Sequence, residues 1–320
     1  MSDAARLFCL DTVLIDLVLR VDALPERAGD ALASEQLVAV GGGFNAMSAA
    51  ARHDMDVVYA GRLGEGPFTS LALAALAREG VSTPVERHEA LDIGVCVVLL
   101  ERDGERTFVT SPGAEATLRR HDLDALDPQP GDYVVVSGYN VMYPGSAETV
   151  LGWVGDLTPG VTVVFDPATR VADIPSGYLA QMVARTNWLT CNADEARVLA
   201  PGRDAAACAQ SLASMFSTCD VVVRDGARGC VVALRDSPVV AVNGFVVPVV
   251  DTNGAGDVHT GVFVARLASG EEPTAAARWA NAAAAMAIGR RGPATGPRLE
   301  EVTAWMARAT PGAPFATGAR

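Results

Sequence analysis

The order of apolar and polar positions predicts a regular alternation of strands and helices from residue 131 onward. Apolar runs typical of buried strands recur there, and most are followed by segments with the apolar spacing of a helix. Strands that alternate with helices predict a mostly parallel sheet covered on both faces, which is a three-layer α/β fold. The expected parallel strands are 133–137, 161–165, 188–190 and 221–224.

The second half also contains an antiparallel pair and a helical C-terminal part. The runs 230–234 and 238–242 are expected to pair, and a further apolar strand is expected to end at Val250. The expected helices are 146–154, 194–199, 205–216, 256–267, 273–288 and 298–307.

The first third mixes strand, helix and hairpin signals. The apolar run 6–15 predicts one buried strand, and 16–22 alternates as a strand does when one face is solvated. A further strand is expected at 57–60, with helices at 45–53 and 68–79.

A hairpin follows, because two β-rich runs, 95–100 and 107–110, are joined by a segment that contains Asp103-Gly104. We therefore expect a small β-sheet lid, formed by about 12–40 and 94–112, on one domain that spans 1–310. The remaining segment, 311–320, is rich in Gly, Ala and Pro and is expected to be loose.

Composition adds a large core and no sign of a membrane segment. The chain has 320 residues, of which 50% are hydrophobic, so a sizeable core can be buried. Its apolar runs are far shorter than the roughly 20 residues of a membrane-spanning helix, and its first residues do not resemble a secretory signal. We expect a cytoplasmic protein without a membrane partner.

Charge and metal-ligand patterns exclude further classes. The net charge is −13 and no cluster of four or more arginines occurs, so no nucleic-acid partner is expected. The six cysteines contain no C-x-x-C pair, and the four histidines are dispersed, which favours buried reduced thiols over a structural zinc site.

The chain contains no lysine. This excludes the G-x-x-x-x-G-K-[ST] phosphate loop, the protein-kinase strand lysine and Schiff-base chemistry. If the chain handles phosphate, arginine, backbone amides and a metal must bind it.

The sharpest motif is D-T-N-G-A-G-D, which runs from Asp251 to Asp257 and opens a long helix. Gly254 and Gly256 permit a tight turn and close approach of another group. The first amides of a helix have no internal partner and attract anions, so Gly254, Ala255 and Gly256 are expected to form an anion hole. Asp257 is then placed to accept a hydroxyl proton during phosphoryl transfer.

This motif resembles the C-terminal signature of the ribokinase/PfkB family of carbohydrate and nucleoside kinases, and other family motifs follow in order. They are the segments V-G-G-G-F-N, G-R-L-G-E-G, F-D-P-A-T-R, C-N-A-D-E-A and V-V-V-R-D-G-A-R-G, and the resemblance extends over nearly the whole chain. It implies a three-layer ribokinase-like domain with a β-sheet lid, and an ATP-dependent kinase that uses Asp257 as its base.

The resemblance also assigns roles to individual residues. Substrate contacts are implied for Asp16, Gly41, Gly43, Asn45 and Arg170, and Asn140, at the end of a predicted strand, is a further candidate. ATP contacts are implied for Asn192, Arg224, Gly226, Gly229 and Asn253, and Asn281, which heads a small-residue helical run expected to pack on the sheet, is expected to border the adenine pocket. Mg²⁺ would be held by Asn192 and Glu195 through waters, and Asp251 is a candidate ligand of a monovalent cation, K⁺, found in part of the family. A homodimer through the lid sheet is a further expectation.

Other interpretations of the same residues stay open. Asn45 and Asn192 are also good helix caps, and His259 is better suited to packing than to catalysis, since it points away from Asp257 on the same helix. The acceptor is expected to be a sugar, sugar acid or related polyol. Leu14 stands where family sugar kinases often have asparagine, and with Phe44 and Met47 beside Asn45 it favours the alternative, a nucleoside. A catalytically silent sensor is the third reading.

Overall fold

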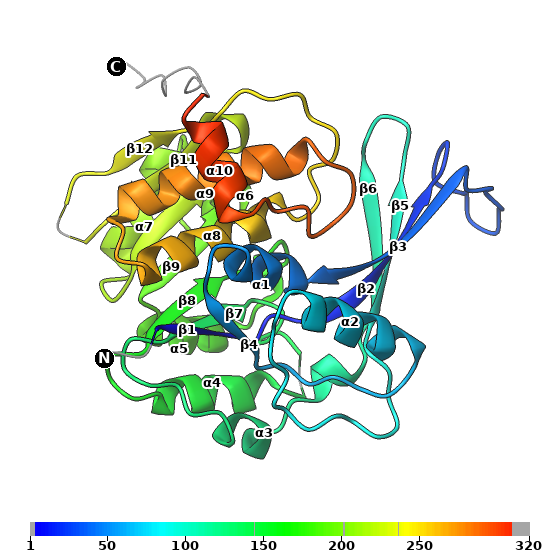
Figure 1. Ribbon diagram of the computed structural model, residues 1–320, viewed down its shortest axis with the longest axis horizontal. Helices are drawn as coiled ribbons and strands as arrows, with labels where there is room; N and C mark the ends of the chain where they lie inside the picture. Colours follow the sequence, from blue (N-terminus) through cyan, green and yellow to red (C-terminus); the bar gives the residue numbers. More distant parts are fainter. Residues whose placement is uncertain (1–3, 144, 201, 236, 309–320) are drawn as a thin grey trace.

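The main body of the molecule is an eight-stranded, mostly parallel sheet between two layers of helices (Figure 1). The computed structural model describes residues 4–143, 145–200, 202–235 and 237–308. In spatial order the strands are β12 (Val240–Asn243), β11 (Gly229–Ala233), β10 (Asp220–Arg224), β9 (Trp188–Asn192), β8 (Thr162–Asp166), β7 (Tyr133–Ser137), β1 (Arg6–Cys9) and β4 (Asp56–Tyr59). All neighbours from β10 to β4 are parallel, while β11 and β12 pair antiparallel.

Alternate residues of these strands feed two separate cores, one on each face of the sheet. In β1, for example, Leu7 and Cys9 pack on one side, and Phe8 packs on the other. The first core is covered by α1 (Phe44–Ala51), α2 (Pro67–Arg78), α8 (Ala255–Ala268), α9 (Pro273–Ile288) and α10 (Leu299–Met306). The second is covered by α3 (Arg120–Asp124), α4 (Ala147–Asp156), α5 (Ser176–Arg185), α6 (Ala193–Leu199) and α7 (Ala205–Met215).

A four-stranded sheet projects from one side of the body and is called the lid sheet below (Figure 1). Its strands in spatial order are β3 (Glu35–Gly42), β2 (Val13–Arg20), β5 (Val95–Leu100) and β6 (Arg106–Ser111). The central pair β2–β5 is parallel and the two outer pairs are antiparallel. The predicted hairpin and three-layer fold are therefore confirmed; that this sheet moves as a lid stays a prediction.

Two strand predictions were wrong. The run 6–15 is not one strand, because the chain leaves the large sheet after Cys9 and enters the lid sheet at Val13. No strand ends at Val250 either: Val249 and Val250 are 62% and 59% exposed, and the backbone there is irregular. An apolar run shows neither which sheet its residues join, which explains the first error, nor whether they join a sheet at all, which explains the second.

The remaining element predictions differ little from the structure, with three omissions: strand β3, whose residues were predicted only as part of the lid, and two helices. The helices α3 and α5 had not been predicted, and α5 has only two fully buried side chains, Met182 and Val183, so its apolar signal is weak. All six cysteines are buried and free. Among the described residues, no helix combines the length and apolarity needed to cross a membrane. The predicted loose segment 311–320 lies outside the described residues.

Candidate active site

The turn before α8 has the geometry that an anion hole requires. Gly254 precedes the helix with φ +72°, a left-handed conformation that glycine adopts without strain. The backbone N–H groups of Gly256 and Asp257 have no hydrogen-bonding partner among the described residues. They lie in the first turn of a 14-residue helix, at its positive end, where negative charge is stabilised.

Asp257 is held in this first turn by a residue from a distant helix. Asn45, in the first turn of α1, donates from Nδ2 to Asp257 Oδ2 at 2.9 Å and accepts at Oδ1 from the Ala294 amide at 2.7 Å. Gly43, not Asn45, is the N-cap of α1. The helix-cap alternative for Asn45 is therefore wrong, because its side chain bridges α1 to the turn.

Burial raises the pKa of the Asp257 carboxyl, and the nearby Asp166 carboxylate raises it further. The hydrogen bond from Asn45 and the charge of Arg224 act in the opposite direction. A carboxylate with a raised pKa is a stronger base than a solvated one, which suits proton abstraction from an alcohol.

The residues predicted to contact substrate from the lid lie beside this turn. Asp16 is buried on β2 and accepts a hydrogen bond at 3.4 Å from the side chain of Asn253. Burial raises the pKa of Asp16 to about 6. Gly41 pairs across the lid sheet with Leu14, and any Cβ at Gly41 would lie 2.2 Å from an Asp16 carboxylate oxygen. Glycine is therefore required there by the position of the Asp16 carboxylate.

A buried arginine at the end of β10 lies against the turn before α8. Arg224, at the end of β10, donates from Nη1 to Asp166, Thr190 and Thr260 at 3.0, 2.7 and 3.0 Å. A Cβ on Gly256 would lie 3.5 Å from the guanidinium, so the positive charge lies next to the predicted anion hole. The carboxylates of Asp166 and Glu195 hold the pKa of Arg224 above its usual value.

Asn192 and Glu195 form a reciprocal cap at the start of α6. The Asn192 side-chain oxygen accepts from the amides of Asp194 and Glu195, and Glu195 accepts from the Asn192 amide at 2.8 Å. The cap alternative for Asn192 thus matches the structure. It also fixes the Glu195 carboxylate near Arg224, at 3.7 Å from Nη2.

The Glu195 environment fits a hard divalent cation. Burial and the repulsion of Asp166 raise the pKa of Glu195, and a bound cation would remove that penalty. Magnesium binds one or two carboxylates and keeps several waters. Among the described residues, three or more possible ligand atoms of Asp, Glu, His or Cys lie within 4.8 Å of one another only at Glu86, His121 and the buried Asp122. Asp166 and Glu195 do not form such a cluster, so water and phosphate would supply most ligands of a magnesium ion held there.

The other predicted nucleotide residues flank this region. Gly226 and Gly229 bound a short 3₁₀ turn after β10, with φ of +56° and +103°. Asn281, on α9, donates to the carbonyls of Val242 and Asn243 at 3.0 and 3.2 Å, and its oxygen lies 3.1 Å from Nε2 of His259.

His259 is buried, and burial lowers its pKa to about 3. The imidazole is therefore neutral at physiological pH, as expected for a packing residue.

Two predicted substrate residues are engaged elsewhere in the structure. Asn140 is buried, accepts from the Ser137 amide at 2.9 Å and donates to the Leu10 carbonyl at 2.7 Å. Arg170 has a 63% exposed side chain and pairs with Asp173 at 2.8 Å. Neither makes a direct contact with Asp257 or Asp16, so their substrate roles stay predictions.

Asp251 joins three parts of the molecule. Its carboxylate accepts from the amides of Asn253 at 2.9 Å and Gly292 at 3.1 Å, and it forms an ion pair with Arg106 of the lid sheet. Asp251 and Gly292 are thus in direct contact although 41 positions separate them along the chain. The ion pair with Arg106 was not predicted, because its partners are 145 positions apart.

One acidic residue of the site was missed. Asp11 follows β1 at the carboxyl edge of the sheet, and burial together with the Asp257 charge raises its pKa to about 7. The signal was available, since ligands of open α/β sheets bind outside the carboxyl ends of the strands.

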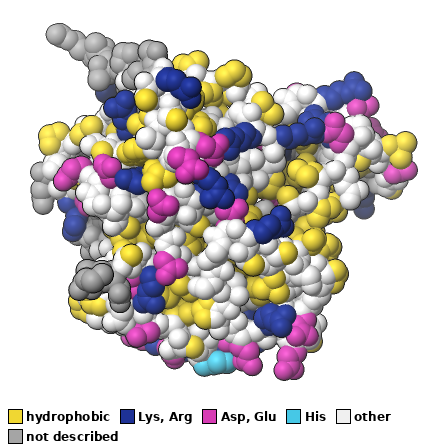
Figure 2. Space-filling model, viewed as in Figure 1, with side chains coloured by type: hydrophobic (Ala, Val, Ile, Leu, Met, Phe, Trp, Pro, Cys, Tyr) yellow, Lys and Arg dark blue, Asp and Glu magenta, His cyan; other side chains and the backbone are white. Residues whose placement is uncertain are grey.

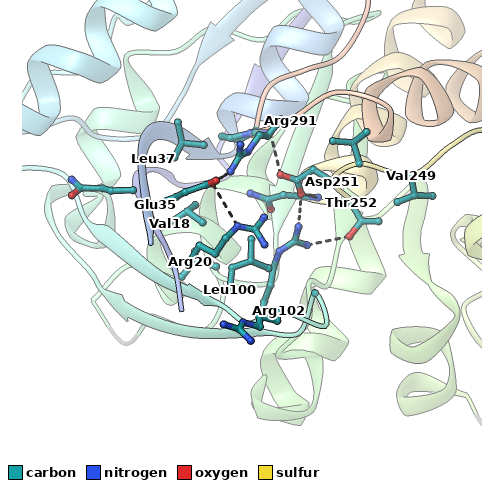
Figure 3. A pocket seen from close by; sticks show the side chains of 18 of the residues that line it. Val18, Arg20, Glu35, Leu37, Leu100, Arg102, Val249, Asp251, Thr252 and Arg291 are labelled. Atoms are coloured by element: carbon teal, nitrogen blue, oxygen red, sulfur yellow. Dashed lines mark hydrogen bonds and ion pairs between the residues drawn. The ribbon is translucent and has the colours of Figure 1, made fainter. Parts of the chain in front are cut away.

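A cavity of about 970 Å³ lies between the lid sheet and the loops around Asp251 and Gly292 (Figure 3). Four arginines line it against three carboxylates, in a chain whose net charge is −13. The charged lining residues are Arg20, Arg102, Arg106, Arg291, Glu35, Asp103 and Asp251. Figure 2 shows arginine side chains gathered where the lid sheet meets the body.

Comparison with known proteins identifies the family. The model of the pfkB family of carbohydrate kinases matches residues 4–300. The chain belongs to this family. Membership makes it an ATP-dependent carbohydrate kinase, as its motifs predicted.

Among its relatives in the PfkB family, the protein named as uncharacterised sugar kinase YegV of Escherichia coli is 32% identical over 293 residues, covering 90% of each chain. The ATP-dependent ribose-1-phosphate kinase of Halopiger xanaduensis is 29% identical and covers 91% of this chain and 94% of its own length. The crystal structure of ribokinase from Thermotoga maritima superposes with a TM-score of 0.81 at 23% identity, covering 95% of this chain and all of that one. The last similarity confirms the ribokinase-like fold.

Proposed function

We propose that this PfkB-family kinase transfers the γ-phosphate of ATP to a hydroxyl of a sugar, sugar acid or related polyol. The observation that carries the proposal is the Asp257 carboxylate, which lies in the first turn of α8 beside the unpaired amides of Gly256 and Asp257. A base and an anion site within one helical turn are the two parts that in-line phosphoryl transfer to an alcohol requires.

Asn45 orients Asp257 for this role. Its amide donates a hydrogen bond to Oδ2 of Asp257. Oδ1 of Asp257 has no hydrogen bond among the described residues and is available to take the hydroxyl proton. Because Asn45 is itself fixed by the Ala294 amide, the carboxylate cannot easily rotate away.

The phosphate is stabilised by the turn and by the charge beneath it. The amides of Gly256 and Asp257 donate to the phosphoryl oxygens, and Arg224 adds a fixed positive charge next to Gly256. Because ion pairs with Asp166 and Glu195 already fix the Arg224 guanidinium, the side chain does not have to move when the reaction proceeds.

Magnesium, when bound, neutralises charge on the ATP phosphates. Glu195 is the residue that would hold it through water, with Asp166 nearby, and Asn192 fixes the Glu195 carboxylate through the cap of α6. A monovalent cation at Asp251 stays a prediction, and such an ion would compete with Arg106 for the same carboxylate.

The lid cavity favours an acceptor that carries an acidic group. Arg20 lies four residues from Asp16 on the same face of β2 and lines the cavity. Among the described residues, its guanidinium makes no hydrogen bond and forms an ion pair with Glu35 at 3.5 Å. Arginine binds carboxylate and phosphate groups through its planar fork. The name of the Halopiger xanaduensis relative, a ribose-1-phosphate kinase, agrees with such an acceptor.

The nucleoside alternative loses part of its motivation in the structure. Leu14, Phe44 and Met47 are 9%, 6% and 0% exposed and pack in the cores of the lid and the body. They therefore do not form the apolar wall of an open base-binding site.

The test of the proposed function is the variant Asp257→Asn. We expect it to bind ATP as the wild type does and to lose turnover by about two to four orders of magnitude, the usual contribution of general-base catalysis. The measurement is ADP release across a panel of neutral sugars, sugar acids, sugar phosphates and nucleosides. Asp204→Asn, at the N-cap of α7, is the matched control, because asparagine also caps helices well.

The panel also separates the rival functions. Near-normal turnover of Asp257→Asn would remove this residue from the mechanism. ADP release with nucleosides alone would replace the sugar reading, and binding of ligands without ADP release from the wild type would indicate the sensor.

A further inference from the structure

The Asp251 carboxylate needs a positive partner because it is largely withdrawn from water. Its side chain is 16% exposed, and two backbone amides bind its oxygens. Amides stabilise a carboxylate but do not neutralise it, and a buried charge without a counter-charge is costly.

Arg106 of strand β6 provides that counter-charge. Its guanidinium pairs with Asp251 and also donates from Nη1 to the hydroxyl of Thr252 at 3.1 Å. The Arg106 side chain is only 19% exposed, so this ion pair is far less screened by solvent than a surface pair. Figure 3 shows Asp251 and Thr252 facing the cavity under the lid sheet.

The same contact reaches the turn that binds phosphate. Asp251 accepts from the amide of Asn253, and the Thr252 carbonyl accepts from the amide of Ala255, the first residue of α8. Through these two bonds a side chain of the lid sheet holds residues 251–255, which directly precede the unpaired amides of the anion hole.

A monovalent cation at Asp251 does not fit this arrangement. The carboxylate already has a full positive charge against it, and a second cation at the same oxygens would be repelled by the guanidinium. The donors around Asp251 also include the amides of Asn253 and Gly292, which supply hydrogens rather than the oxygen ligands that a cation needs.

We propose that Arg106 takes the place of a monovalent cation: it neutralises Asp251 and orders the anion-hole turn, so the reaction requires no such ion. Arg106 acts as a positioning residue, through Asp251 and Thr252. Because it belongs to the lid sheet, the turn is ordered only when that sheet lies against the body. The inference rests on the proposed kinase function, but it is tested separately from it.

The first test compares ions with the wild-type enzyme. ADP release is measured in potassium chloride and in tetramethylammonium chloride at equal ionic strength, with saturating MgATP and the best acceptor. We expect rates equal within about twofold. Stimulation by potassium of about tenfold or more would overturn the inference and leave the proposed function intact.

The second test uses Arg106→Gln. We expect turnover about 10- to 100-fold lower in tetramethylammonium, the effect of a misplaced catalytic turn, and partial recovery in potassium, because the unneutralised Asp251 then attracts a small cation. Arg106→Lys should lie between the two, since it keeps the charge and loses the planar fork. Arg120→Gln, which removes ion pairs with Asp124 and Asp156, is the control for loss of an arginine elsewhere. Wild-type turnover of Arg106→Gln, or reduced turnover without any recovery in potassium, would overturn the inference.

The third test does not use activity. Melting temperatures are measured in the same two salts without substrate. Potassium should raise the melting temperature of Arg106→Gln and should affect neither the wild type nor the double variant Arg106→Gln/Asp251→Asn. An equal response of wild type and Arg106→Gln would overturn the inference even if no acceptor is phosphorylated. If Arg106→Gln fails to fold, Arg106→Met, which also removes the charge and leaves Asp251 unneutralised, replaces it in both comparisons.

Discussion

At the scale of single residues, the site depends on carboxylates kept close together at a cost. Asp11, Asp16, Glu195 and Asp257 all have raised pKa values, chiefly through burial. Such a cluster suits hydroxyl groups, which donate hydrogen bonds to carboxylates, and hydrated magnesium, which neutralises their charge. The cationic counterpart is the arginine-lined cavity beneath the lid sheet.

Arg20 should distinguish acidic from neutral acceptors. Replacing it by alanine is expected to raise KM for sugar acids or sugar phosphates by roughly 10- to 100-fold, since a hydrogen bond to a charged group contributes about 1.5–3 kcal/mol. KM for neutral sugars should change by less than about threefold. Steady-state kinetics with matched acidic and neutral sugars measure this difference.

The control for this prediction is Arg27→Ala. Arg27 is an exposed arginine in the loop between β2 and β3, and it does not line the cavity. An equal rise in KM for both kinds of acceptor in Arg20→Ala would contradict the role assigned to Arg20.

At the scale of elements, the lid sheet has an apolar outer face as well as a functional inner one. Strand register places Val38, Leu17, Val97 and Val109 in one row across all four strands, opposite in direction to Asp16. Val38 and Val109 are 42% and 61% exposed. A contiguous apolar row on an exposed sheet favours contact with another chain, and the expected partner is a second copy.

The predicted homodimer can be tested at Val109. Val109→Asp places a charge at the β6 end of this row and should convert a dimer into a monomer without loss of folding. Light scattering after size exclusion measures the mass, and Val246→Asp, at an 81% exposed residue after β12, is the control. A wild type that is monomeric at micromolar concentration would contradict the prediction.

At the scale of the whole molecule, the raised carboxylate pKa values make stability depend on pH. A carboxyl group with a higher pKa in the folded state binds more protons there than in the unfolded chain. Its burial therefore costs most above the folded pKa, and stability increases as the pH falls through that value. Buried His53 and His259, with pKa values lowered to about 4 and 3, act in the opposite direction only below about pH 6.5, where the unfolded histidines gain protons.

We expect the ligand-free protein to gain about 1 kcal/mol of unfolding free energy between pH 8 and pH 6.5, mainly from Asp11 and Glu195. Urea unfolding at the two pH values measures the change. Asp11→Asn should reduce the gain, because the amide does not titrate. Unchanged stability over this interval would show that these carboxyl groups titrate with ordinary pKa values, and stability that falls would contradict the prediction outright.

Several parts of the site could be predicted from sequence because they are local. Seven consecutive residues, Asp251 to Asp257, contain the signals for the turn at Gly254 and the start of α8. The cap formed by Asn192 and Glu195 lies within four consecutive residues. Whether Asn45 caps its helix was harder to predict, because the answer depends on which distant group its side chain meets, and it donates to Asp257, 212 positions away.

The sequence by itself determined the alternation of strands and helices, the hairpin of the lid sheet, the absence of lysine and the motif that ends at Asp257. These features follow from short-range periodicity and residue chemistry. Only the tertiary structure decided that Asn45 holds Asp257, that Arg224 lies beneath the turn, and that Arg106 reaches Asp251. Those contacts join residues 212, 32 and 145 positions apart along the chain, and nothing in local sequence records such pairings, because packing of the whole fold brings them together.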